Sequence, residues 1–342
     1  MDNAINLKFM LLNAENLFLL WDEKPPVDFL NLNEKQWKDL SSSVFPNKPL
    51  RKLKEIASIF LEVDPDIIML TEVGGEESLQ NFNEHFLQNN FYTALIEGNS
   101  DRSIDVGFLI NKRCGFHFHI ETNKNRSINF LYPHEKESLA KGINTEHIPT
   151  SHKFSRDVAE LHLFKTKKEE PFLITLLTHL KSPLDPDYID PQGAERRQAE
   201  LKTLVQIYNE QKNNYKDCPI IVCGDFNGNA SRHNTDKEFK DLYQLTDLED
   251  VLELNNTPII ERQTFFHVRS GGKSEGRQID FCFLGDSVKK NFQNTKSFIY
   301  RYKNELGIRI HAPSTIEEKE YLPSDHYPII FELHNLNLIK KN

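Results

Sequence analysis

The chain has 342 residues, of which 38% are hydrophobic and 27% are charged, and its formal net charge is −9. This composition is typical of a globular protein and excludes collagen-like and low-complexity classes. The acidic balance argues against a protein that holds nucleic acid mainly through a broad basic surface. It is compatible with an enzyme that gathers carboxylates around a cation.

No run of about 18 apolar residues occurs, so stable membrane insertion is not expected. The apolar run near the start is broken by Asn13 and Glu15, which fits a first strand better than a signal peptide. We therefore expect a cytoplasmic location, with export by a leaderless route left open. No Cys-x-x-Cys occurs, which predicts buried thiols in a reducing compartment at all four cysteines. These are Cys114, Cys218, Cys223 and Cys282.

Short apolar runs rich in Ile, Val, Phe and Leu predict strands. In chain order they cover residues 7–12, 66–71, 105–110, 158–164, 172–178, 220–223, 278–284 and 326–333. The run VAELHLF at 158–164 alternates apolar and polar residues, which predicts a strand with one face in solvent. Helices are expected at 47–63 and 191–211, since each segment has an early proline followed by good helix formers. Strands mixed with long helices predict sheet layers with helices packed outside, in one domain.

Three irregular segments interrupt this pattern, at residues 22–46, 122–155 and 301–323. Loops of such length are usually functional or disordered. The segment 122–155 holds the strongest local group of basic residues, and a solvated excursion is favoured slightly over a substrate-binding arm. Its apolar stretch 127–132, SINFLY, either packs on the body of the protein or touches a membrane, and packing is favoured.

Polar side chains recur at the ends of the predicted strands. Each alone has a simple explanation, because Asp and Asn are favoured turn residues. Asp280 is harder to dismiss, since a carboxylate within an apolar strand needs a partner or a shifted pKa. Together they predict a common site. The set comprises Asn13, Glu15, Glu72, His179, Asp225, Asn227, Asp280, Asp325 and His326.

These residue types suit metal-assisted cleavage of a phosphate ester. Glu, Asp and Asn oxygens favour magnesium, with manganese as the alternative, over zinc. The metal neutralises growing charge and lowers the pKa of a bound water. A histidine oriented by an aspartate can take the proton of that water, and a second histidine or an arginine can donate to the phosphate oxygens.

The motifs LLNAEN, TEV, FSRDV, THLKS, GDFN, GRQIDF and PSDHYP, in this order between residues 11 and 328, resemble the endonuclease/exonuclease/phosphatase superfamily. The resemblance implies an α/β fold: a four-layer α/β/β/α sandwich with two central mixed β-sheets flanked by helices. It implies one domain over residues 1–342, with the active site among the loops at one end of the sandwich. It also implies a divalent-metal-dependent phosphoester hydrolase that acts as a monomer.

The resemblance assigns metal binding to residues near the ends of the first two predicted strands and before the last. Glu72 resembles the principal metal ligand, and Asn13 resembles the asparagine beside it. Asp325 resembles an aspartate that can join the metal shell. Glu15 is included in this shell, although many relatives carry an aspartate there, one methylene shorter.

The catalytic roles are carried over in the same way. His326 resembles the general base and Asp280 the carboxylate that orients it. Asp225 and Asn227 resemble the pair that positions the nucleophile and the scissile phosphate. His179 resembles the histidine that contacts the phosphate and assists the leaving group.

Arg156 lies where related nucleases place an arginine that contacts the phosphate. His179 stands where apurinic endonucleases usually carry no histidine, so repair of abasic sites is not favoured. The favoured reading is a phosphodiesterase, a nuclease with nucleic acid as its substrate. A phospholipid, sphingomyelin or inositol-phosphate phosphoesterase with the same active site is the alternative. A scaffold without catalytic activity ranks last, because the key residues are all present.

Overall fold

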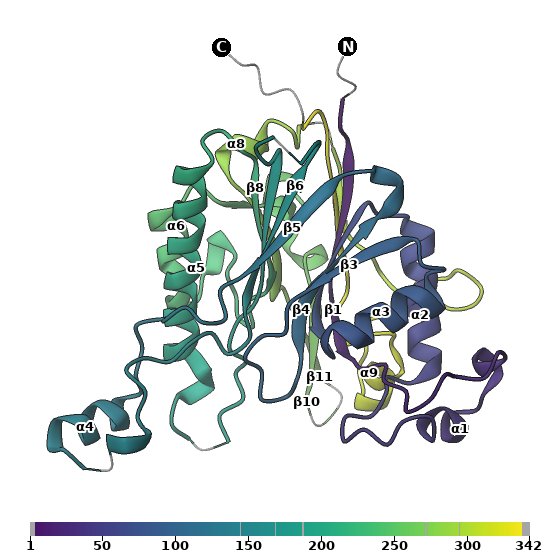
Figure 1. Cartoon of the computed structure of the whole chain (residues 1–342), viewed down its shortest axis with the longest axis horizontal. Helices are drawn as coiled ribbons and strands as arrows, with labels where there is room; N and C mark the ends of the chain where they lie inside the picture. The colour runs from purple at the N-terminus through teal and green to yellow at the C-terminus, as the bar shows by residue number, and fades with distance from the viewer. Residues whose placement is uncertain are drawn as a thin grey trace.

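Two six-stranded mixed β-sheets stack face to face, and helices cover their outer faces (Figure 1). The computed structural model describes residues 4–143, 145–167, 169–186, 188–269, 271, 273–293 and 295–336. The four-layer sandwich implied by the sequence motifs is confirmed. No helix among these described residues is long and apolar enough to cross a membrane.

The first sheet pairs the N-terminal strand with the last described one. In spatial order it contains β13 (Ser297–Ile299), β14 (Ile329–Leu333), β1 (Leu7–Leu17), β2 (Ile67–Val73), β4 (Asp105–Asn111) and β3 (Phe91–Leu95). Strands β1 and β2 are parallel, and the other neighbours are antiparallel. Helices α2 (Leu50–Val63) and α3 (Gly75–Phe86) lie on its outer face.

The second sheet is built around one parallel pair, β7 and β8. In spatial order it contains β5 (His117–Thr122), β6 (Val158–Phe164), β7 (Leu173–His179), β8 (Ile220–Asp225), β12 (Asp280–Leu284) and β9 (Glu249–Asp250). Helices α5 (Ala194–Asn214) and α6 (Lys240–Leu245) cover its outer face. The hairpin β10 (Phe265–Arg269) and β11 (Lys273–Arg277) forms a separate two-stranded sheet.

Short helices complete the described chain: α1 (Glu34–Lys38), α4 (Pro133–Lys141), α7 (Val251–Leu254), α8 (Asp286–Lys289) and α9 (Ile316–Tyr321). Three of them, α1, α4 and α9, lie inside segments expected to be irregular. The side chains of Ile128 and Phe130 in the SINFLY stretch are buried, 3% and 8% exposed, so this stretch packs on the body of the protein.

The apolar core continues from one sheet to the other. The Sγ atom of Cys223 on β8 lies 3.2 Å from the Sδ atom of Met69 on β2, across the interface of the two sheets. A second apolar cluster lies between the second sheet and α5, with Leu204 and Ile207 of the helix against Val222 of β8. All four cysteines are free, three of them buried and Cys114 partly exposed.

All eight predicted strands are present, as β1, β2, β4, β6, β7, β8, β12 and β14, and both predicted helices are present as α2 and α5. The prediction for residues 158–164 is wrong in one respect. Glu160 and His162 on β6 are only 3% and 2% exposed, because α5 covers the face that alternation assigned to solvent. Six strands were not predicted: β3, β5, β9, β10, β11 and β13.

We predict that Gly224→Ala destabilises the protein by about 3 kcal/mol, since overpacking against a rigid neighbour is costly. Gly224 on β8 has φ of +143°, and a Cβ atom there would lie 1.8 Å from the carbonyl oxygen of Thr178 on β7. Urea unfolding measures the change. Gly115→Ala is the control, because its φ of +65° costs about 1 kcal/mol for alanine but no atom lies within 4 Å. Equal losses in both variants would contradict the close approach of β7 and β8.

Candidate functional site

Three predicted site residues lie in one row across the second sheet. Strands β7 and β8 are parallel and end together, which pairs His179 with Asp225. Strand β12 runs the other way and begins at Asp280, which pairs with Asp225 from the other side. The side chains of all three residues are buried, each 2% exposed. The strand register alone therefore brings an imidazole and two carboxylates to the same edge.

The first sheet contributes two more of the predicted residues. His326 lies just before β14, and its Nδ1 is 2.7 Å from Oδ2 of Asp280. Its Nε2 is 4.0 Å from Oδ2 of Asp225. The Nδ2 of Asn13 on β1 donates a hydrogen bond of 3.0 Å to the same Asp225 oxygen. One candidate ligand atom from each of Asp225, Asp280 and His326 lies within 4.8 Å of the others, so the two sheets meet in one site.

Glu72 and Glu15 lie at irregular points of two neighbouring parallel strands. The register shifts between Asn13 and Leu17 on β1, and between Thr71 and Val73 on β2. Both glutamates have left-handed backbones, with φ of 49° at Glu15 and 59° at Glu72. Such bulges re-aim side chains at the ends of sheets, and strained backbone is common at functional sites.

The two glutamates have different partners. Oε2 of Glu72 accepts one hydrogen bond, from the backbone N–H of Asn16 at 3.1 Å, and no Lys or Arg of the described residues pairs with it. Oε2 of Glu15 instead lies 3.1 Å from Nζ of Lys48 and 2.7 Å from Nζ of Lys52. Glu72 is thus available to a cation, whereas Glu15 is engaged by two ammonium groups.

Asp325, the remaining predicted metal ligand, lies beside His326 and has a cationic partner. Its Oδ2 is 3.1 Å from Nζ of Lys319 on α9. Burial raises the pKa of Asp325, but the positive charges of His326 and Lys319 outweigh burial and hold it below its usual value. For Lys48, the partner of Glu15, burial lowers the pKa to about 8, although the charge of Glu15 acts in the opposite direction.

The buried carboxylates of Asp225 and Asp280 and the imidazole of His326 shift one another's pKa values. Burial and the neighbouring charge of Asp280 raise the pKa of Asp225 above its usual range. Burial by itself lowers the pKa of His326, but the carboxylates of Asp280 and Asp325 raise it above that of a free imidazole. Closely spaced acids and an imidazole of this kind exchange protons readily, as general acid–base chemistry requires.

Arg156 is a buried cation without a carboxylate partner. Arg156 is only 6% exposed, and its Nε has no hydrogen-bond partner among the described residues. Nη1 donates to the Oγ of Ser155 at 3.3 Å. The charges of Glu200, Glu72 and Asp225 act on the guanidinium from beyond ion-pair distance, but burial outweighs them and lowers its pKa, so a bound anion would stabilise it. His179 is close by in the same cleft, and its buried Nδ1 also lacks a partner among the residues described.

His179 and Asn227 are held in fixed positions. Nε2 of His179 is 3.6 Å from Oδ2 of Asp225. Burial, reinforced by the positive charge of Arg156, holds the pKa of His179 well below its usual value, so the imidazole is neutral. Asn227 has φ of 53°, its backbone N–H donates to Asp225 at 2.8 Å, and its Nδ2 donates to the Leu180 carbonyl at 3.0 Å.

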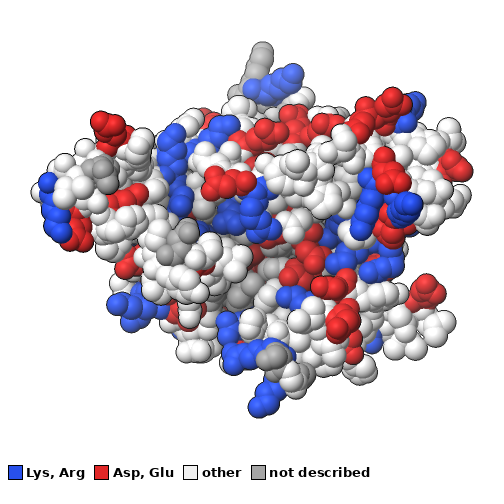
Figure 2. All heavy atoms as spheres, turned by 90° about the horizontal axis from the view of Figure 1, so that it is seen from below, with Lys and Arg blue, Asp and Glu red and all other residues white. Residues whose placement is uncertain are grey.

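A cleft of about 1080 Å³ opens at this end of the sandwich. Six of the predicted residues line it: Glu72, Arg156, His179, Asp225, Asn227 and His326. The β10–β11 hairpin contributes Phe265, His267 and Arg277 to its wall. Figure 2 looks onto this end of the molecule and shows basic side chains on both sides of a hollow, with acidic side chains beside it.

Several residues around the site were not predicted. Arg102 lines the cleft and donates a 2.7 Å hydrogen bond to Oδ1 of Asn16. Nothing in its local sequence distinguishes it from a surface arginine. Lys48 and Lys52 are spaced four residues apart, as side chains on one helix face are, and this spacing is the only signal that could have found them. The basic residues of segment 122–155 do not line the cleft.

Comparison with solved structures gives the same fold at low sequence identity. The chain matches TDP2 from C. elegans (14% identity, 96% of this chain, 75% of that chain, TM-score 0.54) and the human Nocturnin catalytic domain with bound sulfate anion (14%, 96% and 96%, 0.55). It also matches an endonuclease/exonuclease/phosphatase family protein from Bacteroides thetaiotaomicron (16%, 97% and 96%, 0.54). The third structure is named as a member of the family that the motifs resemble, so the fold implied by that resemblance is confirmed. No family model matches the chain, and no curated protein matches its sequence.

We predict that inorganic phosphate or sulfate raises the melting temperature of the metal-free protein by several degrees, and that Arg156→Met abolishes this shift. An anion that binds only the folded state stabilises it by mass action. The substitution removes a buried charge but also its attraction to Glu200, Glu72 and Asp225, so the melting temperature of each variant without anion is the baseline for its shift.

Sulfate also stabilises proteins without binding at a site, so a control variant is needed. Arg51→Met serves, because Arg51 forms a half-exposed ion pair with Glu55 on α2. Its shift should equal that of the unsubstituted protein. An undiminished shift in Arg156→Met would mean that the anion binds elsewhere.

Proposed function

We propose that the protein is a divalent-metal-dependent phosphodiesterase that cleaves nucleic acid with a water activated by His326. One observation carries the proposal. The imidazole of His326, oriented by Asp280, faces Asp225 in the cleft that also holds the buried guanidinium of Arg156. A base, a group to position the nucleophile and a group to hold the phosphate are thus adjacent.

The residues at the cleft fit a hard divalent cation. Glu72 would hold it together with Asp325, whose carboxylate would then leave Lys319, and with Asn13 beside them, because carboxylate and amide oxygens suit magnesium, or manganese in its place. Glu72 supports this fit, since its carboxylate has no cationic partner among the described residues. When bound, such an ion neutralises phosphate charge and lowers the pKa of water. Its charge would also favour the neutral form of His326.

His326 would act as the general base through Nε2. Its Nδ1 is engaged by Asp280 at 2.7 Å, which fixes the ring and leaves Nε2 turned toward Asp225. In this arrangement Asp280 is the orienting group, and Asp225 and Asn227 position the attacking water and the scissile phosphate. A positioned base of this kind contributes about 10²–10⁴-fold to the rate.

Arg156 and His179 would bind the phosphate oxygens. Both side chains are buried beside the acids, so their donors act in a place of low dielectric where they are most effective. His179 is neutral, and it can donate one hydrogen bond from the ring nitrogen that carries the proton. The same group is suited to assist the leaving oxygen.

Two observations favour nucleic acid over a small phosphoester. Several arginines line the cleft, which suits a substrate with more than one phosphate. The D. rerio TDP2 structure, which has the same fold, is complexed with a single-strand DNA product. The apolar stretch 127–132, the one argument for contact with a lipid surface, is packed in the core.

We predict that His326→Ala lowers kcat by about 10²–10⁴-fold on bis-p-nitrophenyl phosphate with magnesium, because the base is lost. His334→Ala is the control, since that histidine lies after β14 and is outside the cleft. Turnover in His326→Ala equal to that of the control would rule out the assigned base.

A panel of single-stranded DNA, RNA, sphingomyelin and inositol phosphates at fixed salt then identifies the substrate class. Activity confined to the lipids or inositides would exclude the nuclease hypothesis.

We predict unequal effects of the two glutamates on the metal. Glu72→Gln should weaken Mn²⁺ binding, followed by electron paramagnetic resonance, by at least tenfold, since it removes a ligand without a competing partner. Glu15→Gln should weaken binding by only a few-fold, because its carboxylate is held by Lys48 and Lys52. Equal losses would instead make Glu15 a direct ligand that leaves its lysines when metal binds.

A further inference from the structure

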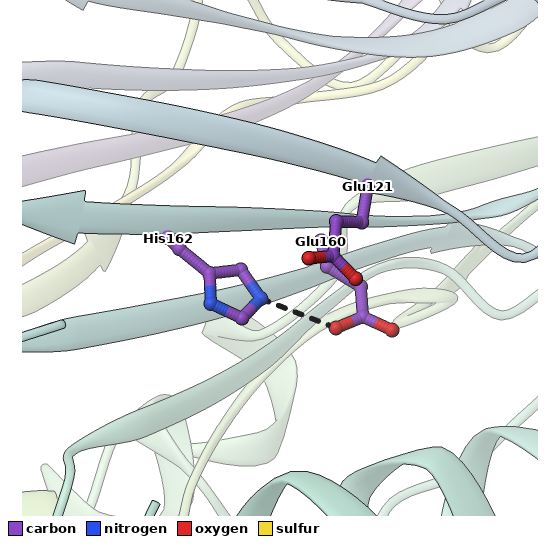
Figure 3. A group of neighbouring side chains, drawn as sticks. All are labelled: Glu121, Glu160 and His162. Carbon is purple, nitrogen blue, oxygen red and sulfur yellow. Dashed lines mark hydrogen bonds and ion pairs between the residues drawn. The ribbon is translucent and has the colours of Figure 1, made fainter. Parts of the chain in front are cut away.

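A second group of histidines and glutamates lies on the outer face of the second sheet, away from the cleft. In the pairing of β5 with β6, His119 is directly opposite His162, and Glu121 is directly opposite Glu160. Figure 3 shows Glu121, Glu160 and His162 turned toward one another. Like charges directly opposite on neighbouring strands repel, so the two glutamates require a compensating group.

The β6 half of this group is buried and pre-arranged. Glu160 and His162 are 3% and 2% exposed, beneath α5. Oε1 of Glu160 accepts a 2.7 Å hydrogen bond from Nδ2 of Asn123, and Oε2 accepts one of 2.7 Å from Nε2 of Gln211. These donors are uncharged, and no Lys or Arg of the described residues forms an ion pair with Glu160. Arg126 forms its ion pair with Glu210 and acts on Glu160 only from beyond ion-pair distance, so this buried carboxylate remains unfavourable without a closer cation.

The β5 half is exposed and can adjust. The side chains of His119 and Glu121 are 62% and 51% exposed, and Nε2 of His119 lies 3.3 Å from Oε1 of Glu121. On the buried side, Nε2 of His162 lies 3.3 Å from Oε2 of Glu160. Candidate ligand atoms of Glu121, Glu160 and His162 all lie within 4.8 Å of one another.

We propose that His119, Glu121, Glu160 and His162 bind one divalent transition-metal ion of the Zn²⁺ class. Zinc bonds of about 2.0–2.2 Å in a tetrahedron place neighbouring ligand atoms about 3.3–3.6 Å apart. Both His–Glu separations have this value. The remaining ligand atoms lie farther apart, and His119 is outside the group within 4.8 Å, so the exposed side chains of His119 and Glu121 would rotate toward Glu160 and His162 when the ion binds.

The donor set distinguishes this ion from the one in the cleft. Two imidazoles with two carboxylates favour zinc, whereas oxygen donors favour magnesium. Asn123 and Gln211 hydrogen-bond to the carboxylate of Glu160, as supporting residues do around metal ligands, and the ring of Tyr215 packs edge-on against His162 at 5.5 Å. The ion would fasten the edge strand β5 to β6 and remove the repulsion of the two glutamates.

The experiment uses the full chain carrying Glu72→Gln, which weakens metal binding in the cleft. Zn²⁺ binding is measured by competition with a chromogenic chelator, and Co²⁺ is used as a spectroscopic probe. We expect one Zn²⁺ per chain, a rise in melting temperature with Zn²⁺, and the strong visible absorption of four-coordinate Co²⁺ rather than the weak bands of octahedral oxygen ligation.

Glu121→Gln and His119→Gln change exposed side chains and should each reduce Zn²⁺ affinity at least tenfold, with loss of the Co²⁺ spectrum. His117→Gln is the matched control, because His117 is also exposed on β5 but lies opposite Phe164, and it should bind as before. Absence of Zn²⁺ binding, or equal affinity in all three variants, would overturn the proposal and leave a hydrogen-bonded cluster. The outcome does not depend on whether the protein proves to be a phosphodiesterase.

Discussion

The site depends on two carboxylates, Asp225 and Asp280, that the second sheet forces side by side. Their strands pair in register, so they cannot separate without loss of the sheet. The first sheet supplies the groups that stabilise these adjacent carboxylates, since His326 hydrogen-bonds to Asp280 and Asn13 donates to Asp225. Stacking of the two sheets and assembly of the site are therefore one event. Removing either partner would leave a buried charge uncompensated, which costs more than an ordinary hydrogen bond.

Some charged residues around the cleft form close ion pairs and others do not, and this difference indicates which of them can bind a ligand. Glu15 forms ion pairs with Lys48 and Lys52, whereas Glu72 and Arg156 form no ion pair among the described residues and attract each other only at longer range. Ionic groups kept only for stability are expected to form close pairs. A carboxylate and a guanidinium that both lack a close partner in one cleft fit the metal cation and the phosphate anion of the proposed reaction.

Most strands of the fold and several residues of the candidate site could be predicted from the sequence, because strand ends are visible as apolar runs followed by polar residues. That rule located Asp225, Asp280 and His326, which are indeed brought together. It could not show that Glu15 is engaged by lysines, since Lys48 and Lys52 are read locally as ordinary helix residues. It also missed Arg102 and the β10–β11 hairpin, since β11 (KSEGR) has no apolar side chain and β10 (FFHVR) is a short run. Contacts between segments distant in the chain decide such details.

The strand at 158–164 also shows that a local pattern cannot reveal contacts between distant segments. Alternation correctly placed Glu160 and His162 on one face, but only tertiary structure shows that α5 covers that face. A polar residue at a position later covered by a helix must find partners, or it would have been replaced by an apolar one. Asn123 and Gln211 satisfy the hydrogen bonding of Glu160 but not its charge. With Glu121 directly opposite, the remaining negative charge calls for a cation, and the histidines determine which kind of cation fits.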